Sequence, residues 1–192
     1  MTNYTIIGLV SGLFSVLAYV PYVFLIYKKR INPHPFSWFL WAVLGFSTLV
    51  TYIGVGAKET LPIAFVSFFG PFLVFLLTLR YWKGKFPRFD YFCLGFSFLA
   101  IIIYIVFKEA AIALTISLLG DLFAALPTIR KTYKDPSSEN IWTWFLFTLS
   151  AFIALFAIKD FSYGILIFPL YLFVYESLMC ILILRKRFIF KK

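Results

Sequence analysis

Seven apolar stretches, separated by short polar breaks, decide what this chain can fold into. A helix needs about 20 mostly apolar residues to cross a bilayer. The stretches cover residues 4–27, 36–56, 61–82, 90–107, 110–130, 141–158 and 163–185. The breaks between them carry turn-forming and charged residues and are too short to hold a soluble domain. The sequence therefore predicts an all-α integral membrane protein with seven transmembrane helices.

The basic residues predict the direction in which the chain crosses the membrane. The chain is 62% hydrophobic and 14% charged, whereas soluble domains average about 45–50% and about 25%. Of its 18 Lys and Arg residues, all but Lys58, Lys108 and Lys159 lie at the end of the first, third, fifth or seventh stretch or directly after it. Cytoplasmic loops carry an excess of Lys and Arg. We therefore expect an N-out, C-in protein of the cell inner or plasma membrane, whose net charge of +10 reflects topology and not nucleic-acid binding.

The chain repeats itself after 106 residues, without a gap across residues 6–52. The pairs that coincide include Pro21 with Pro127, Tyr27 with Tyr133, Lys28 with Lys134, and Trp38 with Trp144. Each repeat contains three helices, which is an odd number. A second repeat attached directly to the first would therefore lie inverted in the membrane, and a fourth helix between them restores the orientation of the first repeat. The repeat predicts a 3+1+3 parallel arrangement: a first triple-helix bundle over 1–82, a linker helix over 83–109, and a second triple-helix bundle with a basic tail over 110–192.

The stretch "LPTIRKTYKDPSSENIWTWFLF", residues 126–147, resembles the signature of the PQ-loop superfamily, which includes the SWEET sugar transporters. The shared features are a late proline in the first helix of a bundle, a Tyr-Lys pair, a polar hairpin and an aromatic second helix. The chain departs from the family after each proline, where Tyr22 and Thr128 replace the defining glutamine. The prolines of the second helices and the asparagines of the third helices in SWEETs are also missing. The resemblance implies a seven-helix transporter working by alternating access around a midplane site.

Two acidic residues lie where a bilayer is most apolar. Asp121 is about ten residues into the fifth stretch, and Glu176 is about thirteen into the seventh. A carboxyl group at that depth costs several kcal/mol unless it is paired, hydrated or protonated, and it usually faces a cavity or the bundle interior. Three roles stay open: binding a cationic substrate, carrying a coupling proton, or holding helices together. On the repeat, Asp121 falls on Ser15 and Glu176 on Gly70, and this asymmetry favours a functional role.

Four more polar or aromatic side chains are expected near the same depth. The predicted substrate- or proton-binding set therefore adds Ser15, Tyr52, Ser67 and Tyr175 to the two acids. Taken singly, each of these residue types is more often a packing residue than a ligand contact.

Two prolines and two tryptophans are candidates for an inner gate. Pro21 and Pro127 lie in the cytoplasmic third of their stretches, and a proline inside a helix removes a hydrogen bond and kinks it. The kinks either shape packing or let the inner helix ends swing. Trp38 and Trp144 begin the second and sixth stretches. They either anchor helix ends at the headgroup boundary or close the inner mouth of a cavity.

The sequence contains no HExxH motif, no nucleotide-binding loop and no Cys/His cluster with metal-ligand spacing. We therefore expect no enzyme activity, no metal and no cofactor. The expected function is transport of a small polar solute, with the midplane acids binding a cationic or amine-bearing substrate or a coupling proton. The alternative is a membrane receptor or sorting protein of KDEL-receptor-like plan, without solute flux. The expected partners are the substrate and the lipid bilayer. Substrate identity, transport direction and formation of a homo-oligomer stay open.

Overall fold

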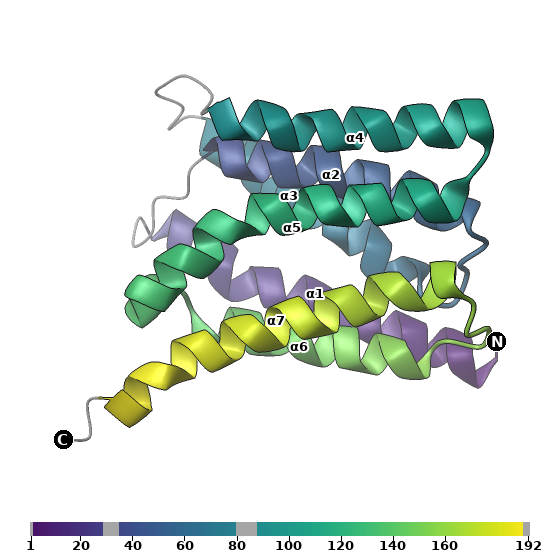
Figure 1. Cartoon of the computed structure of the whole chain (residues 1–192). Coiled ribbons are helices and arrows are strands. Elements are labelled where there is room, and N and C mark those ends of the chain that lie inside the picture. The colour runs from purple at the N-terminus through teal and green to yellow at the C-terminus, as the bar shows by residue number, and fades with distance from the viewer. Residues whose placement is uncertain (1, 29–34, 80–87, 190–192) are drawn as a thin grey trace.

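The computed structural model describes residues 2–28, 35–79 and 88–189. Within them the chain forms seven α-helices, one short 3-10 turn and no strands (Figure 1). The elements are α1 (Asn3–Tyr27), α2 (Pro35–Gly54), α3 (Leu61–Thr78), α4 (Arg88–Phe107), α5 (Ala110–Lys134), η2 (Pro136–Ser138), α6 (Ile141–Phe156) and α7 (Tyr163–Ile189). The seven helices predicted from the apolar stretches are confirmed as helices, with ends within four residues of those expected.

Side-chain caps and turn residues fix several helix ends. The Thr2 hydroxyl accepts a hydrogen bond from the backbone N–H of Thr5 at the start of α1. Asn140 caps α6, because its Oδ1 accepts from the backbone N–H groups of Trp142 and Thr143 at 2.8 and 3.3 Å. Between α4 and α5 the chain reverses at Lys108, whose φ of 57° is in the left-handed region. These local interactions place each helix boundary close to the polar break seen in the sequence.

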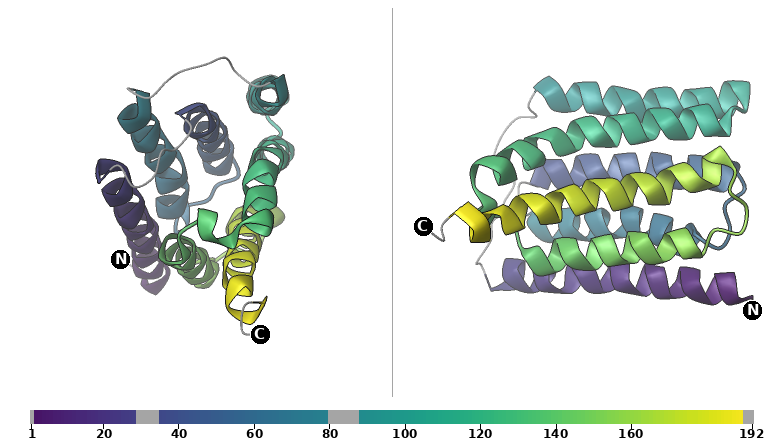
Figure 2. Two further views of the ribbon diagram at one scale, coloured as in Figure 1. Left: turned by 90° about the vertical axis from the view of Figure 1, so that its left-hand side faces the viewer. Right: turned by 60° about the horizontal axis from the view of Figure 1, so that its bottom comes forward.

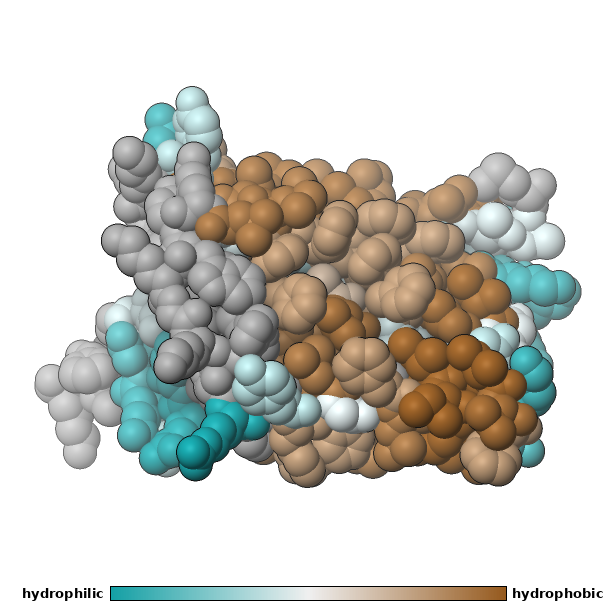
Figure 3. Space-filling view, turned by 90° about the horizontal axis from the view of Figure 1, so that it is seen from above, coloured by the Kyte–Doolittle hydropathy of each residue, from teal (hydrophilic) through white to brown (hydrophobic). Residues whose placement is uncertain are grey.

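Within the described ranges, four helical segments are long and apolar enough to cross a membrane: Asn3–Tyr27, Leu61–Thr78, Ala110–Lys134 and Tyr163–Arg185. Three shorter apolar segments are Trp38–Gly54, Leu94–Phe107 and Ile141–Phe156. Many large apolar side chains on the outside of the helices are exposed. Figure 3 shows them as a broad apolar band between hydrophilic residues at the two ends of the molecule. This surface is that of a membrane-embedded protein, because a bilayer covers apolar side chains that water would not.

The two ends of the bundle differ in charge, and we name them by their contents. The N-terminal end holds Thr2 and the turns that follow α2, α4 and α6 (Figure 1). The basic end holds the 135–140 loop and the C-terminal part of α7. Basic residues that the structure describes at or near the basic end are Lys28, Arg88, Arg130, Lys131, Lys134 and Arg185. The expected basic residues at 29–30 and 80–85 lie outside the described residues.

The helices pack in a pattern that relates the first three to the last three. Helix α3 contacts both α1 and α2, and α7 contacts both α5 and α6. Between these triplets, α1 contacts α6 and α2 contacts α5. Helix α4 packs on α5 and α2. Figure 2 shows this bundle end-on and from a second side.

Two buried serine pairs connect the triplets. Across α1 and α6, the Ser11 hydroxyl donates to the carbonyl oxygen of Ser150 at 2.9 Å, and the Ser150 hydroxyl donates to that of Ser11 at 2.8 Å. Across α2 and α5, the hydroxyl oxygens of Ser47 and Ser117 are 2.7 Å apart. Ser11 and Ser117 coincide on the 106-residue shift, and each lies about 10–12 Å along its helix from the N-terminal end. The pairs therefore close the seam between the triplets in that half of the molecule.

Candidate functional site

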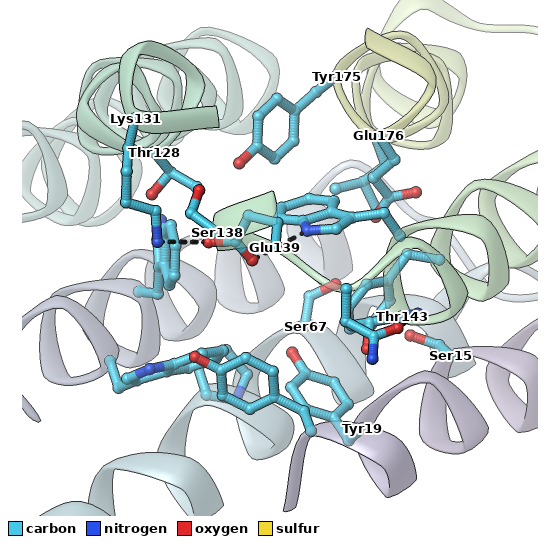
Figure 4. A pocket seen from close by; sticks show the side chains of 18 of the residues that line it. Ser15, Tyr19, Ser67, Thr128, Lys131, Ser138, Glu139, Thr143, Tyr175 and Glu176 are labelled. Carbon is cyan, nitrogen blue, oxygen red and sulfur yellow. Dashed lines mark hydrogen bonds and ion pairs between the residues drawn. The ribbon is translucent and has the colours of Figure 1, made fainter. Parts of the chain in front are cut away.

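A cavity of about 700 Å³ lies between the two triplets. Its inner part is lined by Ser15 of α1, Ser67 of α3, Asp121 of α5 and Glu176 of α7, near the middle of their helices. From there it extends to Lys131 and the 137–140 loop at the basic end. Figure 4 shows the cavity with α1 on one side and α7 on the other. The cavity thus extends from the middle of the helices towards the basic end, and the serine pairs lie beyond Ser15 on the side of the N-terminal end.

The structure brings most of the predicted site residues together. Those that line the cavity are Ser15, Trp38, Ser67, Asp121, Trp144, Tyr175 and Glu176. Pro21 is an interior residue of α1 and is not among the lining residues. Helix α5 continues through position 127 to Lys134, and the side chain of Pro127 lies outside the described part of the chain. The mobility of the two predicted kinks therefore stays a prediction.

Tyr52 lies in the packed core and not at the cavity. It is fully buried, and its ring packs 4.9 Å from that of Phe168. Its hydroxyl donates to the carbonyl oxygen of Ile165 at 2.8 Å and lies 2.7 Å from the hydroxyl of Thr60. Tyr52 therefore ties the α2–α3 turn to α7 near the N-terminal end.

A pair of tyrosine substitutions tests this placement. Tyr52→Phe removes a hydroxyl with two partners, so we expect the free energy of unfolding to fall by about 1–2 kcal/mol. Tyr175→Phe removes a buried hydroxyl that has no protein partner in the described residues, so we expect no loss of stability. Unfolding in mixed micelles with increasing denaturing detergent measures both. An equal loss in the two variants would contradict the placement.

Asp121 is held by a neighbouring helix. The hydroxyl of Tyr171 on α7 donates to Oδ2 of Asp121 on α5 at 2.5 Å. A charge-assisted hydrogen bond of this kind orients the carboxyl group and joins the two helices. Asp121 thus has one firm protein partner while it lines the cavity.

Glu176 is more deeply buried and less well partnered. Its side chain is 7% exposed. Among the described residues, the buried side-chain atoms without a hydrogen-bond partner are Oε2 of Glu176, the hydroxyls of Thr143 and Tyr175, and Nε of Arg185. The first three belong to cavity-lining residues. Buried polar atoms are nearly always hydrogen-bonded, so three residues that line the cavity each carry an oxygen whose hydrogen-bonding capacity the described residues leave unused.

The charges in the cavity do not balance within the described residues. Lys131 lines the cavity but forms an ion pair with Glu139, with Nζ 2.7 Å from Oε1. Asp121 and Glu176 interact electrostatically with each other, and no described basic side chain forms an ion pair with either. Placing a cation between two carboxyl groups in a low-dielectric site is favourable, since Coulomb interactions are stronger there than in water. The inner cavity is therefore lined by two acidic side chains whose charge no described basic residue balances.

Four aromatic side chains of α1 and α2 line the cavity, and we call them its aromatic wall. It consists of Tyr19, Tyr22, Trp38 and Trp41. The ring centroids of Trp38 are 4.9 Å from Tyr22 and 5.2 Å from Trp41. Figure 4 shows Tyr19 on one side, with Tyr175 and Glu176 on the other.

Trp144 is fixed at the basic end by the loop before α6. Its Nε1 donates to Oε2 of Glu139 at 3.2 Å, while Oε1 of the same carboxylate binds Lys131. The Asp135 carboxylate accepts from the backbone N–H of Ser137 at 2.9 Å and orders the loop. These hydrogen bonds hold the Trp144 side chain at the edge of the cavity. Whether Trp144 anchors the helix end or acts as a lid stays a prediction.

Several cavity residues were missed in the sequence, although helical spacing could have found some of them. Tyr19 and Tyr22 lie four and seven residues after Ser15, on the same face of α1. Thr128 lies seven residues after Asp121, on the same face of α5. Thr143 precedes Trp144, a predicted gate residue, by one position. Nothing in the sequence around Thr143 indicates that its side chain lines a cavity.

Comparisons with models of protein families, with curated proteins and with solved structures find no match. Within the described residues there is also no group of three or more His, Cys, Asp or Glu side chains that could hold a metal ion. What the cavity can bind therefore follows from its own side chains: two carboxyl groups, unpartnered hydroxyls and an aromatic wall.

Proposed function

We propose that this protein is a membrane transporter that moves a small amine-bearing or cationic solute by alternating access. The observation that carries the proposal is the cavity itself. It extends from the middle of the helices to the basic end, lies on the far side of the serine pairs from the N-terminal end, and holds two mid-helix carboxyl groups with no basic partner among the described residues. Residues of this kind inside a membrane are expensive and mark substrate or proton pathways.

The packing of the helices supports a 3+1+3 arrangement with two related halves. On the 106-residue shift, the α1–α6 contact corresponds to the α5–α2 contact, and the weaker α3–α6 contact corresponds to α7–α2. The contacts within each triplet correspond in the same way. In this proposal α1–α3 and α5–α7 are two bundles in parallel repeat, α4 connects them, and all seven helices cross the membrane. Rocking of one bundle against the other would open the N-terminal end and close the basic end.

Both acids can take part in substrate binding and in proton transfer. A solute cation would balance the charge of one carboxylate in the loaded state, and a proton would do so in the empty state. Exchange of one for the other would couple solute transport to proton movement in the opposite direction. The positive-inside rule places the basic end, and with it the mouth of the cavity, in the cytoplasm.

Uptake into proteoliposomes tests the proposal. Thermal stabilisation by a panel of amines, amino acids, vitamins and sugars first selects the solutes to be labelled, since a ligand at one hundred times its dissociation constant adds about 2.7 kcal/mol. We expect Glu176→Gln and Asp121→Asn to lower the initial uptake rate of a selected solute at least tenfold. Glu109→Gln, an exposed carboxyl group at the start of α5, is the matched control and should transport normally.

Binding without flux would separate a receptor from a transporter. A membrane receptor of the same helical plan would be stabilised by its ligand and would lose that stabilisation in Glu176→Gln, yet would show no uptake or counterflow. That result would overturn the transport proposal and leave the binding site intact.

A further inference from the structure

We infer that the cavity selects an organic cation with an aromatic or apolar body, whose charged nitrogen carries at least one N–H. The charged nitrogen lies against Glu176 and Asp121, and the body lies against Tyr19, Tyr22 and Trp38. This inference rests on the proposed site and adds the chemical class of its ligand.

The cavity is divided chemically between the two halves of the chain. Its charged lining residues, Asp121, Lys131, Glu139 and Glu176, all come from the second half. The positions that correspond to Asp121 and Lys131 in the first half are Ser15 and Leu25, which also line the cavity but carry no charge. The two halves thus differ in charge at matching positions of the cavity, which suits a ligand with one charged and one uncharged end.

A further difference between the two halves arises at two pairs of corresponding positions, where a large residue in one half corresponds to a small residue in the other. In the first half Tyr19 packs on Gly70, where an added Cβ would meet the tyrosine ring. In the second half the corresponding residues are Ala125 and Glu176. Ala125 is fully buried and leaves space, and Glu176 occupies the third-helix position that is glycine in the first half. A phenol ring on one wall is therefore matched by a carboxyl group on the other.

The ionised carboxylate on the acidic wall requires hydrogen-bond donors, because it can only accept. Oε2 of Glu176 is buried without a partner among the described residues, as are the hydroxyls of Thr143 and Tyr175, which can donate or accept. An ammonium group offers up to three N–H donors, whereas a quaternary ammonium offers none. A quaternary nitrogen would leave the carboxylate oxygen without a donor from the ligand, which is costly. Charge-assisted N–H bonds are also roughly twice as strong as neutral ones, so an uncharged alcohol is a poorer ligand.

The aromatic wall contributes independently of the acids. Tyr19 and Tyr22 each pack beside Trp38, with ring centroids 6.4 and 4.9 Å from it. Rings in this arrangement bury the face or edge of a second aromatic group and add attraction beyond the area they cover. A short alkylamine would form hydrogen bonds with the acidic wall but would make no ring contacts with the aromatic wall.

Calorimetric titration of the purified full chain in nanodiscs tests the inference with a set of related probes. The reference probe is 2-phenylethylamine. Its comparators are 2-phenylethanol, which lacks the charge, n-butylamine, which lacks the ring, and N,N,N-trimethyl-2-phenylethylammonium, which lacks the N–H. Glucose represents an uncharged polyol. We expect 2-phenylethylamine to bind at least tenfold more tightly than each of the others.

Two variants test which wall binds which part of the probe. The comparison of probes on the unaltered chain can be made without these variants. We expect Glu176→Gln to weaken 2-phenylethylamine at least tenfold and to leave 2-phenylethanol unchanged. We expect Trp38→Leu to weaken 2-phenylethylamine and to leave n-butylamine unchanged. Glu109→Gln should bind every probe as the unaltered chain does.

Each contrary result overturns a stated part of the inference. If 2-phenylethanol binds as tightly as 2-phenylethylamine, the site does not require a charged ligand. If n-butylamine binds as tightly, the aromatic wall does not contribute to binding. If the quaternary probe binds as tightly, the site does not require an N–H on the charged nitrogen. Preference for glucose overturns the ligand class altogether. Binding and uptake of n-butylamine as well as of 2-phenylethylamine would defeat this inference and leave the proposed amine transporter standing. Selective binding of 2-phenylethylamine without uptake would support this inference and defeat the proposed transport.

Discussion

Oxidation of a chain carrying Ser47→Cys and Ser117→Cys is expected to abolish solute uptake, and reduction is expected to restore it. The two hydroxyl oxygens are 2.7 Å apart across α2 and α5, so cysteines there are close enough for a disulfide to form. Alternating access requires the bundles to part at the N-terminal end. A covalent bond across the seam would hold that end closed and keep the cavity accessible from the basic end only.

The measurement is initial uptake before and after addition of a reducing agent, in a background with Cys93→Ser and Cys180→Ser. The single variants Ser47→Cys and Ser117→Cys are the controls and should be insensitive to oxidant. Ligand binding from the basic end should persist in the oxidised pair, which shows that the protein is folded. Unchanged uptake with the disulfide fully formed would mean that the seam does not open during transport.

The helices could be predicted from the sequence because their cause is local. Each apolar stretch is long enough to form a helix of several turns, and polar residues such as Asn140 before α6 cap some of the helix ends. The midplane acids could also be found, since a carboxyl group in an apolar run stands out regardless of its tertiary partners. Ser15 was identified through the repeat, because it takes the place of Asp121 in the first half.

The partners of these residues could not be predicted, because they depend on packing between distant helices. Tyr52 was expected near a ligand, yet its hydroxyl binds Ile165, more than 100 residues away in the chain. The bond from Tyr171 to Asp121 joins two helices whose relative rotation no local pattern determines. The same limit applies to Thr143, which becomes a site residue only because α6 turns it towards the cavity.

Gly45→Ala is expected to lower the free energy of unfolding by about 1–3 kcal/mol, the usual cost of overpacking. A Cβ at this position would meet the carbonyl oxygen of Ser67 and would lie 3.0 Å from Cα of Phe68. Both atoms belong to the backbone of α3, which cannot rotate away as a side chain can. Small residues let membrane helices approach closely, so the added methyl group would force α2 and α3 apart.

Gly95→Ala is the matched control for this change. Gly95 also lies inside a helix, α4, but an added Cβ there has no neighbouring atom within 4 Å. Alanine has the higher helix propensity by up to about 1 kcal/mol, so this variant should be as stable as the parent chain or more so. Unfolding of both proteins in the same mixed micelles gives the comparison. Because Ser67 lines the cavity, displacement of α3 should also weaken ligand binding in Gly45→Ala but not in Gly95→Ala. If the two variants lost equal stability, the close approach of α2 and α3 would not be what the glycine provides.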